Sequence, residues 1–236
     1  MDESLRTKLM GVSVATLATA LYKRGLRHQV LQGVHPVRTK GRNMVGPAFT
    51  LRYIPAREDR NPLTVFRNAD HPQRVAIESC PPGHVLVMDS RKDANAASAG
   101  DILVTRLMVR GVAGVVTDGG FRDADTIGGL DIPAYHTRPS SPTNLTLHEA
   151  IDINVPIGCG DAAVFPGDIV VGDADCVIVL PQGIAAEIAD EAAEMTAYED
   201  FVVERVKAGV PIIGLYPCTM EEYAKDFAKW RAQNGR

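Results

Sequence analysis

The hydrophobic and polar positions along the chain predict helical segments mixed with β-rich ones. Residues 4–24 place Leu17 and Leu21 on one face with alanines between, and Gly25 follows as a C-terminal stop, so we expect one helix there. Residues 45–54 alternate apolar and polar side chains, which is typical of a half-buried strand. The chain therefore begins with a helix and then enters a sheet.

The middle of the chain combines short apolar runs with polar segments. A loop is expected at residues 33–42 and a helix at residues 72–80. The apolar run at residues 84–88 predicts a buried strand, and it leads into a polar, small-residue stretch at residues 89–100. A helical run then begins at Asp101.

The second half of the chain is rich in strands and ends in helices. A buried strand at residues 112–117 opens into a loop that holds Arg122 and Asp123. Further strands are expected at residues 132–136, 155–158, 169–171 and 176–180, and helices at residues 183–208 and 221–230. Because strands and helices mix without strict alternation, the pattern predicts an α/β fold with a mixed sheet.

Composition limits the possible partners. The 236 residues are 45% hydrophobic and 23% charged with a net charge of −4, so the chain lacks the basic field that nucleic acids or anionic membranes require. No run approaches the ~18 apolar residues of a membrane span. The four cysteines are widely spaced and the first residues are acidic rather than basic, so we expect a cytoplasmic protein.

The densest cluster of chemically useful residues lies in two short segments. Gly100 and Asp101 stand at a helix start, where backbone N–H groups and the helix dipole can hold a carboxylate. Arg122 and Asp123 follow a buried strand, a common location for active-site groups. An arginine can bind a carboxylate or an enolate oxygen, and an aspartate is a hard ligand for Mg²⁺ or Mn²⁺. The cluster suggests metal-assisted chemistry on a keto acid.

Plainer interpretations of these residues remain open from the pattern alone. Asp101 could be only an N-cap worth about 1 kcal/mol, and Arg122 with Asp123 could form a surface turn. A Schiff-base mechanism would need a lysine of lowered pKa, whereas Lys92 lies among charged neighbours. The histidines are scattered without the paired spacing of a zinc site.

The spacing Asp101-x20-Arg122-Asp123, with Gly100 before it and Leu103 after Asp101, resembles the signature of the class II pyruvate aldolases. These are the 4-hydroxy-4-methyl-2-oxoglutarate / 4-carboxy-4-hydroxy-2-oxoadipate aldolases, which share their fold with the regulator of ribonuclease activity A (RraA). The resemblance implies a single RraA-like swivelling β/β/α domain over residues 1–236 with a mixed sheet. Its core would be about residues 33–209, with extra helical segments at both ends.

The same resemblance implies a role for each matching residue. Asp123 corresponds to the direct ligand of Mg²⁺ or Mn²⁺, and Arg122 to the arginine that contacts the keto oxygen. Asp101 corresponds to a residue that orients a metal-bound water and could serve as acid or base. The substrate carboxylate would be held by the backbone amides of Gly100, Asp101, Ile102 and Leu103.

Two further implications concern the subunits and the pocket. Family members assemble as trimers or dimers of trimers, and a glutamate of a neighbouring subunit lies near the metal. Glu199 is the best match for it, although a solvated acidic helix face is the plain alternative. Ile102 stands where the family usually has asparagine, so a side-chain contact there would be lost while a backbone contact would survive.

Two functions of different classes follow from the resemblance. The first is a lyase that cleaves a 4-hydroxy-2-keto acid to pyruvate or a related keto acid, with oxaloacetate decarboxylation as a side activity. The second is a non-catalytic, RraA-like binding protein that regulates a ribonuclease or another partner. Metal-dependent release of pyruvate distinguishes the two.

Overall fold

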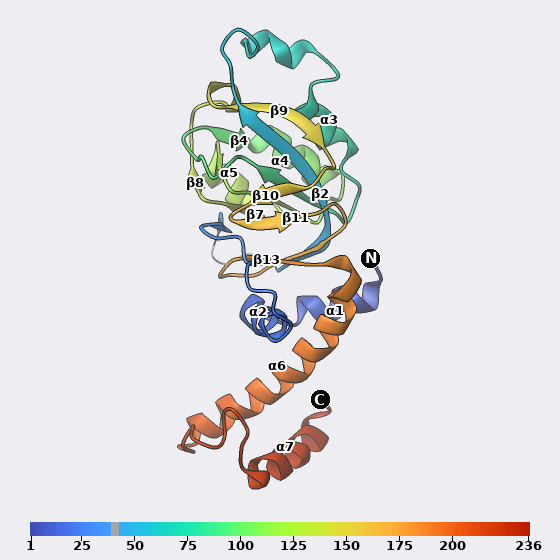
Figure 1. Cartoon of the computed structure of the whole chain (residues 1–236), viewed down its shortest axis with the longest axis vertical. Helices are drawn as coiled ribbons and strands as arrows, with labels where there is room; N and C mark the ends of the chain where they lie inside the picture. The colour runs from blue at the N-terminus through green and yellow to red at the C-terminus, as the bar shows by residue number, and fades with distance from the viewer. Residues whose placement is uncertain (39–42) are drawn as a thin grey trace.

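Figure 1 shows the computed structural model of the chain, which describes residues 1–38 and 43–236. Of the loop expected at residues 33–42, the last four residues lie outside this description. The helices are α1 (Glu3–Met10), α2 (Val14–Tyr22), α3 (Pro72–Ser79), α4 (Asp101–Val109), α5 (Ala124–Gly129), α6 (Ala185–Lys207) and α7 (Glu221–Asn234), with short 3₁₀ turns η1 (Leu63–Arg67), η2 (Asn144–Thr146) and η3 (Gln182–Ile184). The strands are β1 (His35–Pro36), β2 (Met44–Pro55), β3 (Val85–Asp89), β4 (Ala97–Ala99), β5 (Gly114–Thr117), β6 (Gly120–Phe121), β7 (Ala134–His136), β8 (Arg138–Pro139), β9 (His148–Ile153), β10 (Ile157–Cys159), β11 (Ala162–Val164), β12 (Ile169–Gly172) and β13 (Val177–Leu180).

The main sheet is mixed and is organised around β2, its longest strand. Its order is β1-β7-β5-β3-β2-β12-β13, and β9 also pairs with β2. The pairs β2–β3, β3–β5 and β5–β7 are parallel, whereas the pairs that involve β1, β9, β12 and β13 are antiparallel. The α/β fold class with a mixed sheet, expected from the sequence, is confirmed.

A second, three-stranded sheet positions the ends of two segments next to each other. β6 pairs in parallel with β4 on one side and with β8 on the other. Gly120 of β6 is required there, because an added Cβ would lie 2.5 Å from the Cβ of Ser140. Since parallel strands end at the same edge of a sheet, the residues after β4 and β6 emerge side by side.

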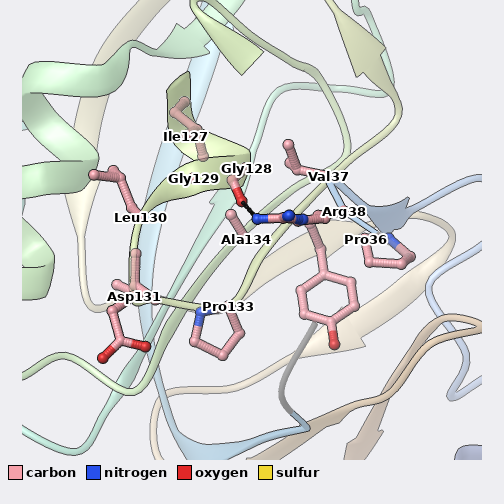
Figure 2. Close-up of a pocket in the computed structure, with 12 residues that line it drawn as sticks. Pro36, Val37, Arg38, Ile127, Gly128, Gly129, Leu130, Asp131, Pro133 and Ala134 are labelled. Carbon is pink, nitrogen blue, oxygen red and sulfur yellow. Dashed lines mark hydrogen bonds between the residues drawn. The ribbon is translucent and has the colours of Figure 1, made fainter. Parts of the chain in front are cut away.

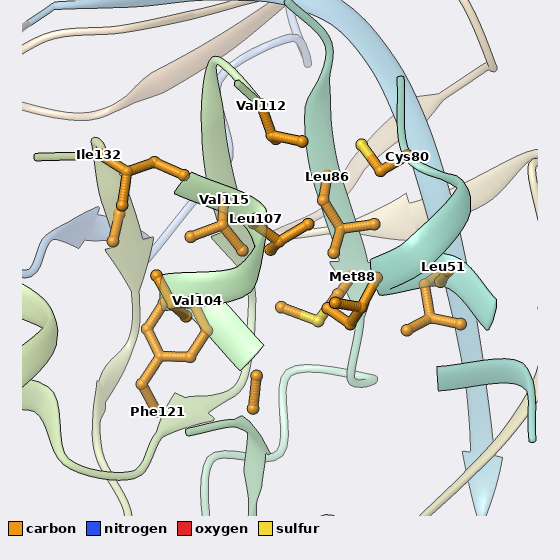
Figure 3. Packing of buried hydrophobic residues seen from close by; sticks show 14 of the residues in the cluster. Leu51, Cys80, Leu86, Met88, Val104, Leu107, Val112, Val115, Phe121 and Ile132 are labelled. Carbon is orange, nitrogen blue, oxygen red and sulfur yellow. The ribbon is translucent and has the colours of Figure 1, made fainter. Parts of the chain in front are cut away.

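The core beneath this edge is apolar and shared by both segments. Val104 and Leu107 of α4 are fully buried in one cluster with Phe121 of β6 (Figure 3). Met88 of β3 and Val115 of β5 belong to the same cluster. Burying apolar surface stabilises a fold by roughly 25 cal/mol per Å². This burial therefore holds α4 and β6 against the same strands of the main sheet.

The structure corrects two expectations. One helix at residues 4–24 is wrong, because α1 ends at Gly11 and α2 starts anew at Ser13. The Ser13 hydroxyl accepts a hydrogen bond from the backbone N–H of Thr16 at 3.1 Å, and this cap restarts the helix although the apolar periodicity continues. The stretch at residues 89–100 also contains a strand, β4, whose small side chains gave no strand signal.

The two C-terminal helices, expected from the sequence, are confirmed as α6 and α7. α6 runs away from the sheet and carries α7 at its far end (Figure 1). The helices are joined by aromatic packing: the ring centroids of Tyr198 and Phe227 lie 5.0 Å apart, and those of Phe201 and Trp230 lie 5.9 Å apart. In the described part of the chain, no helix is long and apolar enough to cross a membrane.

Leu107→Ala tests whether packing under α4 holds this edge in place. Leu107 is fully buried, so the cavity should lower the free energy of unfolding by about 2–5 kcal/mol in urea titrations followed by circular dichroism. Val109→Ala on the same helix is the matched control, because Val109 is 68% exposed and should change that free energy by less than about 0.5 kcal/mol. Equal effects of the two changes would contradict the assignment of this core.

Candidate functional site

The segments that follow β4 and β6 meet in one pocket of about 230 Å³. The backbone N–H of Arg122 donates to the carbonyl of Ala99 at 3.0 Å, which places the end of β6 beside the end of β4. Asp101, Arg122 and Asp123 all line this pocket. The structure thus brings together the three side chains that the sequence pattern singled out.

Gly100 makes room for the carboxylate of Asp123. An added Cβ at Gly100 would lie 3.1 Å from the Oδ2 atom of Asp123 and 3.6 Å from the Cβ of Arg122. The φ of Gly100 is −122°, which any residue adopts, so glycine is needed here for space and not for backbone freedom. Asp123 has a φ of 54°, in the left-handed region where aspartate is enriched among non-glycine residues. This tight turn keeps its carboxylate against the start of α4.

Asp101 is the first residue of α4, and Gly100 is the N-cap. The Oδ1 atom of Asp101 accepts a hydrogen bond from the backbone N–H of Ile102 at 2.7 Å, and the N–H of Leu103 donates to the carbonyl of Gly100 at 3.2 Å. A ligand carboxylate at this helix start would therefore displace Asp101 from the Ile102 amide. Ile102 lines the pocket, but its side chain has no hydrogen-bonding atom, so a polar contact at this position comes through the backbone.

Arg122 and Asp123 have no charged partner in the part of the chain that the structure describes. Both side chains are exposed. Among the described residues, neither forms a salt bridge or a side-chain hydrogen bond, although the two are neighbours in sequence. A cation and an anion that are held side by side without pairing remain available to a ligand with complementary groups.

Besides Ala97 and Ala99 of β4, five further residues line the pocket that sequence reasoning did not single out: Phe66, Gln73, Arg74, Thr143 and Asn144. They come from η1, from α3 and from the turn at η2, which are far from the two central segments in sequence. The helix at residues 72–80 was expected, but no local signal indicated which of its side chains face a pocket. Only the tertiary arrangement shows that.

The Schiff-base alternative loses its support. The Nζ atom of Lys92 donates to Asp161 at 2.5 Å, and this hydrogen bond raises the pKa of Lys92 above its ordinary value. A lysine that forms a Schiff base needs the opposite shift of its pKa. Lys92 also does not line the pocket.

Glu199 and Glu204 differ from the other acids on α6. The other five pair with basic side chains near the two ends of the chain: Glu187 and Glu191 with Arg24, Asp190 with Lys8, Glu194 with Arg231, and Asp200 with Arg236. Glu204 accepts a hydrogen bond from the indole N–H of Trp230 at 2.7 Å. Glu199 instead accepts hydrogen bonds from the hydroxyls of Thr16, at 2.8 Å, and Tyr216, at 3.3 Å. It does not line the pocket of its own chain. Glu199 thus has no cationic partner among the described residues.

The donor atoms of the pocket suit a hard divalent cation. Within residues 1–38 and 43–236, no group of three or more His, Cys, Asp or Glu side chains could hold a metal ion. The pocket has two carboxylates, those of Asp101 and Asp123. Mg²⁺ is commonly bound through one or two carboxylates and keeps several waters, whereas zinc sites use at least three protein ligands. The residues present therefore fit Mg²⁺ or Mn²⁺ and do not fit zinc.

A second pocket, of about 260 Å³, lies between the segment of β1 and the end of α5 (Figure 2). Its Arg38 donates from Nη1 to the carbonyl of Gly128 at 3.2 Å. The pocket is lined by none of the residues singled out from the sequence. We therefore locate the candidate site at the ends of β4 and β6.

Comparison with known proteins places the chain in a family. Residues 14–179 match the RraA-like family, described as Aldolase/RraA, and the chain belongs to this family. A Halalkalibacterium halodurans protein, provisionally named 4-hydroxy-4-methyl-2-oxoglutarate aldolase, is 33% identical over 141 residues, which are 60% of this chain and 67% of that protein. Protein DlpA of Legionella pneumophila is 23% identical over 224 residues, but this chain spans only 34% of its length.

Solved structures agree with the expected fold. Streptomyces coelicolor RraAS2, described as an unusual member of the RNase ES inhibitor RraA protein family, has a TM-score of 0.74 at 32% identity, covering 85% of this chain and 96% of that one. An uncharacterized Pseudomonas syringae protein has a TM-score of 0.76 at 23% identity, covering 92% and 98%. The RraA-like fold with added helices at both ends is thus confirmed.

The packing of His136 against Phe121, behind the site, can be tested through the pH dependence of the free energy of unfolding. Its ring stacks on Phe121, 5.6 Å between centroids, and burial lowers its pKa to about 4. The unfolded chain then takes up this proton near pH 6.5 while the folded chain does not, so the free energy of unfolding should fall as the pH drops from 6.5 towards 4. His136→Phe removes the titrating group, together with the buried Nδ1 atom that has no hydrogen-bond partner among the described residues.

Urea titrations between pH 7.5 and pH 4.5 compare the two proteins. The wild type should lose more of its free energy of unfolding over this range than His136→Phe. Identical pH profiles would mean that His136 titrates in the folded chain as it does in the unfolded one, and that its burial has been misassigned.

Proposed function

We propose that this chain is a divalent-metal-dependent lyase that cleaves a 4-hydroxy-2-keto acid to pyruvate or a related keto acid. The observation that carries the proposal is that Asp101, Arg122 and Asp123 line one pocket. In this pocket the carboxylate of Asp123 lies against Gly100, at the start of α4. The Halalkalibacterium halodurans relative, which is provisionally named an aldolase, supports this class of reaction.

In this proposal, different groups of the chain bind the carboxylate and the keto oxygen of the keto acid. Backbone amides in residues 100–103 at the start of α4 bind the carboxylate, because a helix N-terminus attracts anions. The Ile102 N–H then exchanges the Asp101 carboxylate for the ligand, and the Leu103 N–H shares its bond to the Gly100 carbonyl. Arg122 binds the keto oxygen, where negative charge develops as the enolate forms. This charge is stabilised more strongly in the transition state than in the ground state, so the arginine speeds the step.

Asp123 and Asp101 are the residues that would hold a cation in this pocket. Bound Mg²⁺ or Mn²⁺ would supply Lewis acidity towards the carboxylate and keto oxygens of the substrate. Asp123 is the direct ligand in this assignment, since no salt bridge occupies its carboxylate in the described structure. Asp101 would hold the cation indirectly, by orienting a water molecule.

Cleavage also needs a proton acceptor for the 4-hydroxyl group and a proton donor for the product. Asp101 is our candidate for these transfers, because the ligand frees its carboxylate from the Ile102 amide on binding. The bond between C3 and C4 then breaks, and its electron pair forms the enolate held by Arg122. Loss of carbon dioxide from oxaloacetate leaves the same enolate, which makes this decarboxylation the expected side activity.

The assembly completes the site in this proposal. We infer a trimer or a dimer of trimers in which Glu199 of a neighbouring subunit faces the cation. The support from the structure is that Glu199 is one of two acids on α6, with Glu204, that lack a cationic partner in the described residues.

A non-catalytic regulator is the alternative, and the similarity to RraAS2 favours it, since that protein is described as a member of a ribonuclease-inhibitor family. Only the lyase converts a substrate. A regulator needs no cation and releases no pyruvate, so the experiment below decides between the two functions.

Asp123→Asn tests the proposed reaction. Wild-type protein with Mg²⁺ should release pyruvate from oxaloacetate and from a 4-hydroxy-2-keto acid in an assay coupled to lactate dehydrogenase, and EDTA should abolish the release. Loss of the cation ligand should lower kcat/KM by at least about 100-fold, since the Lewis acid contributes several kcal/mol. The circular dichroism spectrum should stay unchanged.

Asp125→Asn is the matched control, because Asp125 is an exposed carboxylate two positions further on that does not line the pocket. It should keep wild-type activity. No EDTA-sensitive turnover by the wild type across a panel of keto acids would exclude the lyase, and full activity of Asp123→Asn would exclude the assigned ligand.

Glu199→Gln tests the shared site. Glu199→Gln and Asp123→Asn should each be inactive as pure oligomers. Oligomers reassembled from a mixture of the two should regain activity, because some sites then combine an intact Asp123 with an intact Glu199 from the neighbour. Mixtures that stay inactive, or a fully active monomer, would contradict the role of Glu199. Thr16→Val reports separately what the hydrogen bond within the chain contributes to stability.

A further inference from the structure

One face of α6 is buried near the sheet and exposed further along the helix. In the first half of α6, Ile188 and Ala192 are fully buried in a cluster with side chains of α1 and α2. Glu199, Val203 and Val206 follow at intervals of seven, four and three residues, so they lie on the same face of the helix. Val203 is 51% exposed and Val206 is 43% exposed, because α6 runs away from the sheet there (Figure 1).

The far end of α6 and the loop after it carry a concentration of exposed apolar side chains. Among the described residues, 13 large hydrophobic side chains are exposed, and six of them lie within residues 203–220. Exposed apolar residues that are scattered singly are normal on a monomer, whereas a group of them indicates an interaction surface. The six are Val203, Val206, Ile212, Ile213, Tyr216 and Met220.

A second apolar stripe lies on α4, beside the candidate site. Ile102 lines the pocket and is 78% exposed, and Val109 is 68% exposed. Seven residues make about two turns, so these two side chains lie on one face of α4, about 10.5 Å apart along its axis. Arg106 lies between them, and its ion pair with Glu78 at 2.8 Å draws its side chain towards α3. The stripe on α4 therefore has the same seven-residue length as the exposed stretch of α6.

The charges at the ends of the two stripes are complementary. Among the described residues, the Glu199 carboxylate accepts hydrogen bonds from hydroxyl groups and has no cationic partner. In the same part of the chain, Arg122, which lies beside the start of α4, has no charged partner either. These charges set the direction of a contact, because Val206 lies along Val109 when Glu199 is at the start of α4. The far half of α6 lies well away from α4 within one chain (Figure 1), so such a contact joins two copies.

We infer that the far half of α6 docks on the exposed face of α4 in a second copy of this chain. Val203 and Val206 then cover Ile102 and Val109, and Glu199 reaches the pocket next to Arg122. The placement of Glu199 rests on the proposed function, which puts a glutamate of a neighbouring subunit at this site. The apolar contact between the two helices does not depend on the reaction.

This docking closes one side of the pocket. Because Ile102 lines the cavity, a helix that is seated on its exposed side chain removes water from that side. The attraction between Arg122 and an enolate becomes stronger when water is excluded, since the effective dielectric constant falls.

The contact also determines how the copies are arranged. Each copy offers α4 to one neighbour and α6 to the next, so the interface is heterologous. Heterologous contacts generate a ring when the rotation between copies closes. A ring of three copies is the trimer proposed above.

Cross-linking between copies tests this docking. In a Cys218→Ser background, which removes the exposed native thiol, we would combine Val109→Cys with Val206→Cys and treat the protein with a short bis-maleimide. Denaturing gels should show covalent dimers and trimers of the 25.4 kDa chain, because each copy links its α4 to the α6 of the next copy. The yield should exceed that of either single cysteine variant by at least about tenfold, since docked thiols react at a high effective concentration.

Leu63→Cys combined with Val206→Cys is the matched control, because Leu63 is 73% exposed and lies outside α4. It should give no more product than Val206→Cys alone. The inference is overturned if the Val109 and Val206 pair gives no product, if the control or Val206→Cys alone gives as much, or if the wild type sediments as a monomer.

The cross-linking needs no substrate, so its result is separate from that of the pyruvate assay. Full cross-linking together with no turnover of keto acids by the wild type would reject the lyase and leave the docking standing. Turnover without cross-linking would reject the docking and leave the lyase standing.

Discussion

The site depends on the parallel pairing of two very short strands. The hydrogen bond from the Arg122 N–H to the Ala99 carbonyl holds the end of β6 beside the end of β4. From there Gly100 and Asp123 come into contact, and α4 presents its first amides to the same space. A strand of three residues cannot maintain this geometry alone. The apolar cluster around Phe121 supplies the stability, because it holds β6 and α4 against the main sheet.

The sequence singled out three residues that line one pocket in the structure, and it indicated none of the residues around them. Asp101 at a helix start and the turn after a buried strand are local features, so periodicity and spacing indicate them. β4 was missed because alanine and serine give no strand signal, and it forms only through its pairing with β6. The break between α1 and α2 was missed for a different reason, since one capping serine interrupts an apolar pattern that continues on both sides.

Residues brought in by tertiary structure explain the rest of the pocket. Gln73 and Arg74 stand in a helix that the sequence predicted correctly, but their orientation depends on the register between α3 and β4. The buried side-chain amide of Gln73 maintains this register through its hydrogen bond to the Ser98 carbonyl. Removing a buried hydrogen-bond partner costs about 1–3 kcal/mol. The residues around the centre of the pocket are therefore positioned by tertiary packing, which the local sequence pattern does not indicate.

The central claim is that the keto acid and the cation meet at Asp123, Arg122 and the start of α4. The most direct measurement is a crystal structure of the oligomer with Mn²⁺ and oxalate, a planar mimic of the pyruvate enolate. The account predicts anomalous density for Mn²⁺ bonded to the Asp123 carboxylate, with oxalate chelating it and contacting Arg122 and the amides of residues 100–103. Mn²⁺ and oxalate bound away from Asp123, or oxalate bound without the cation, would contradict it.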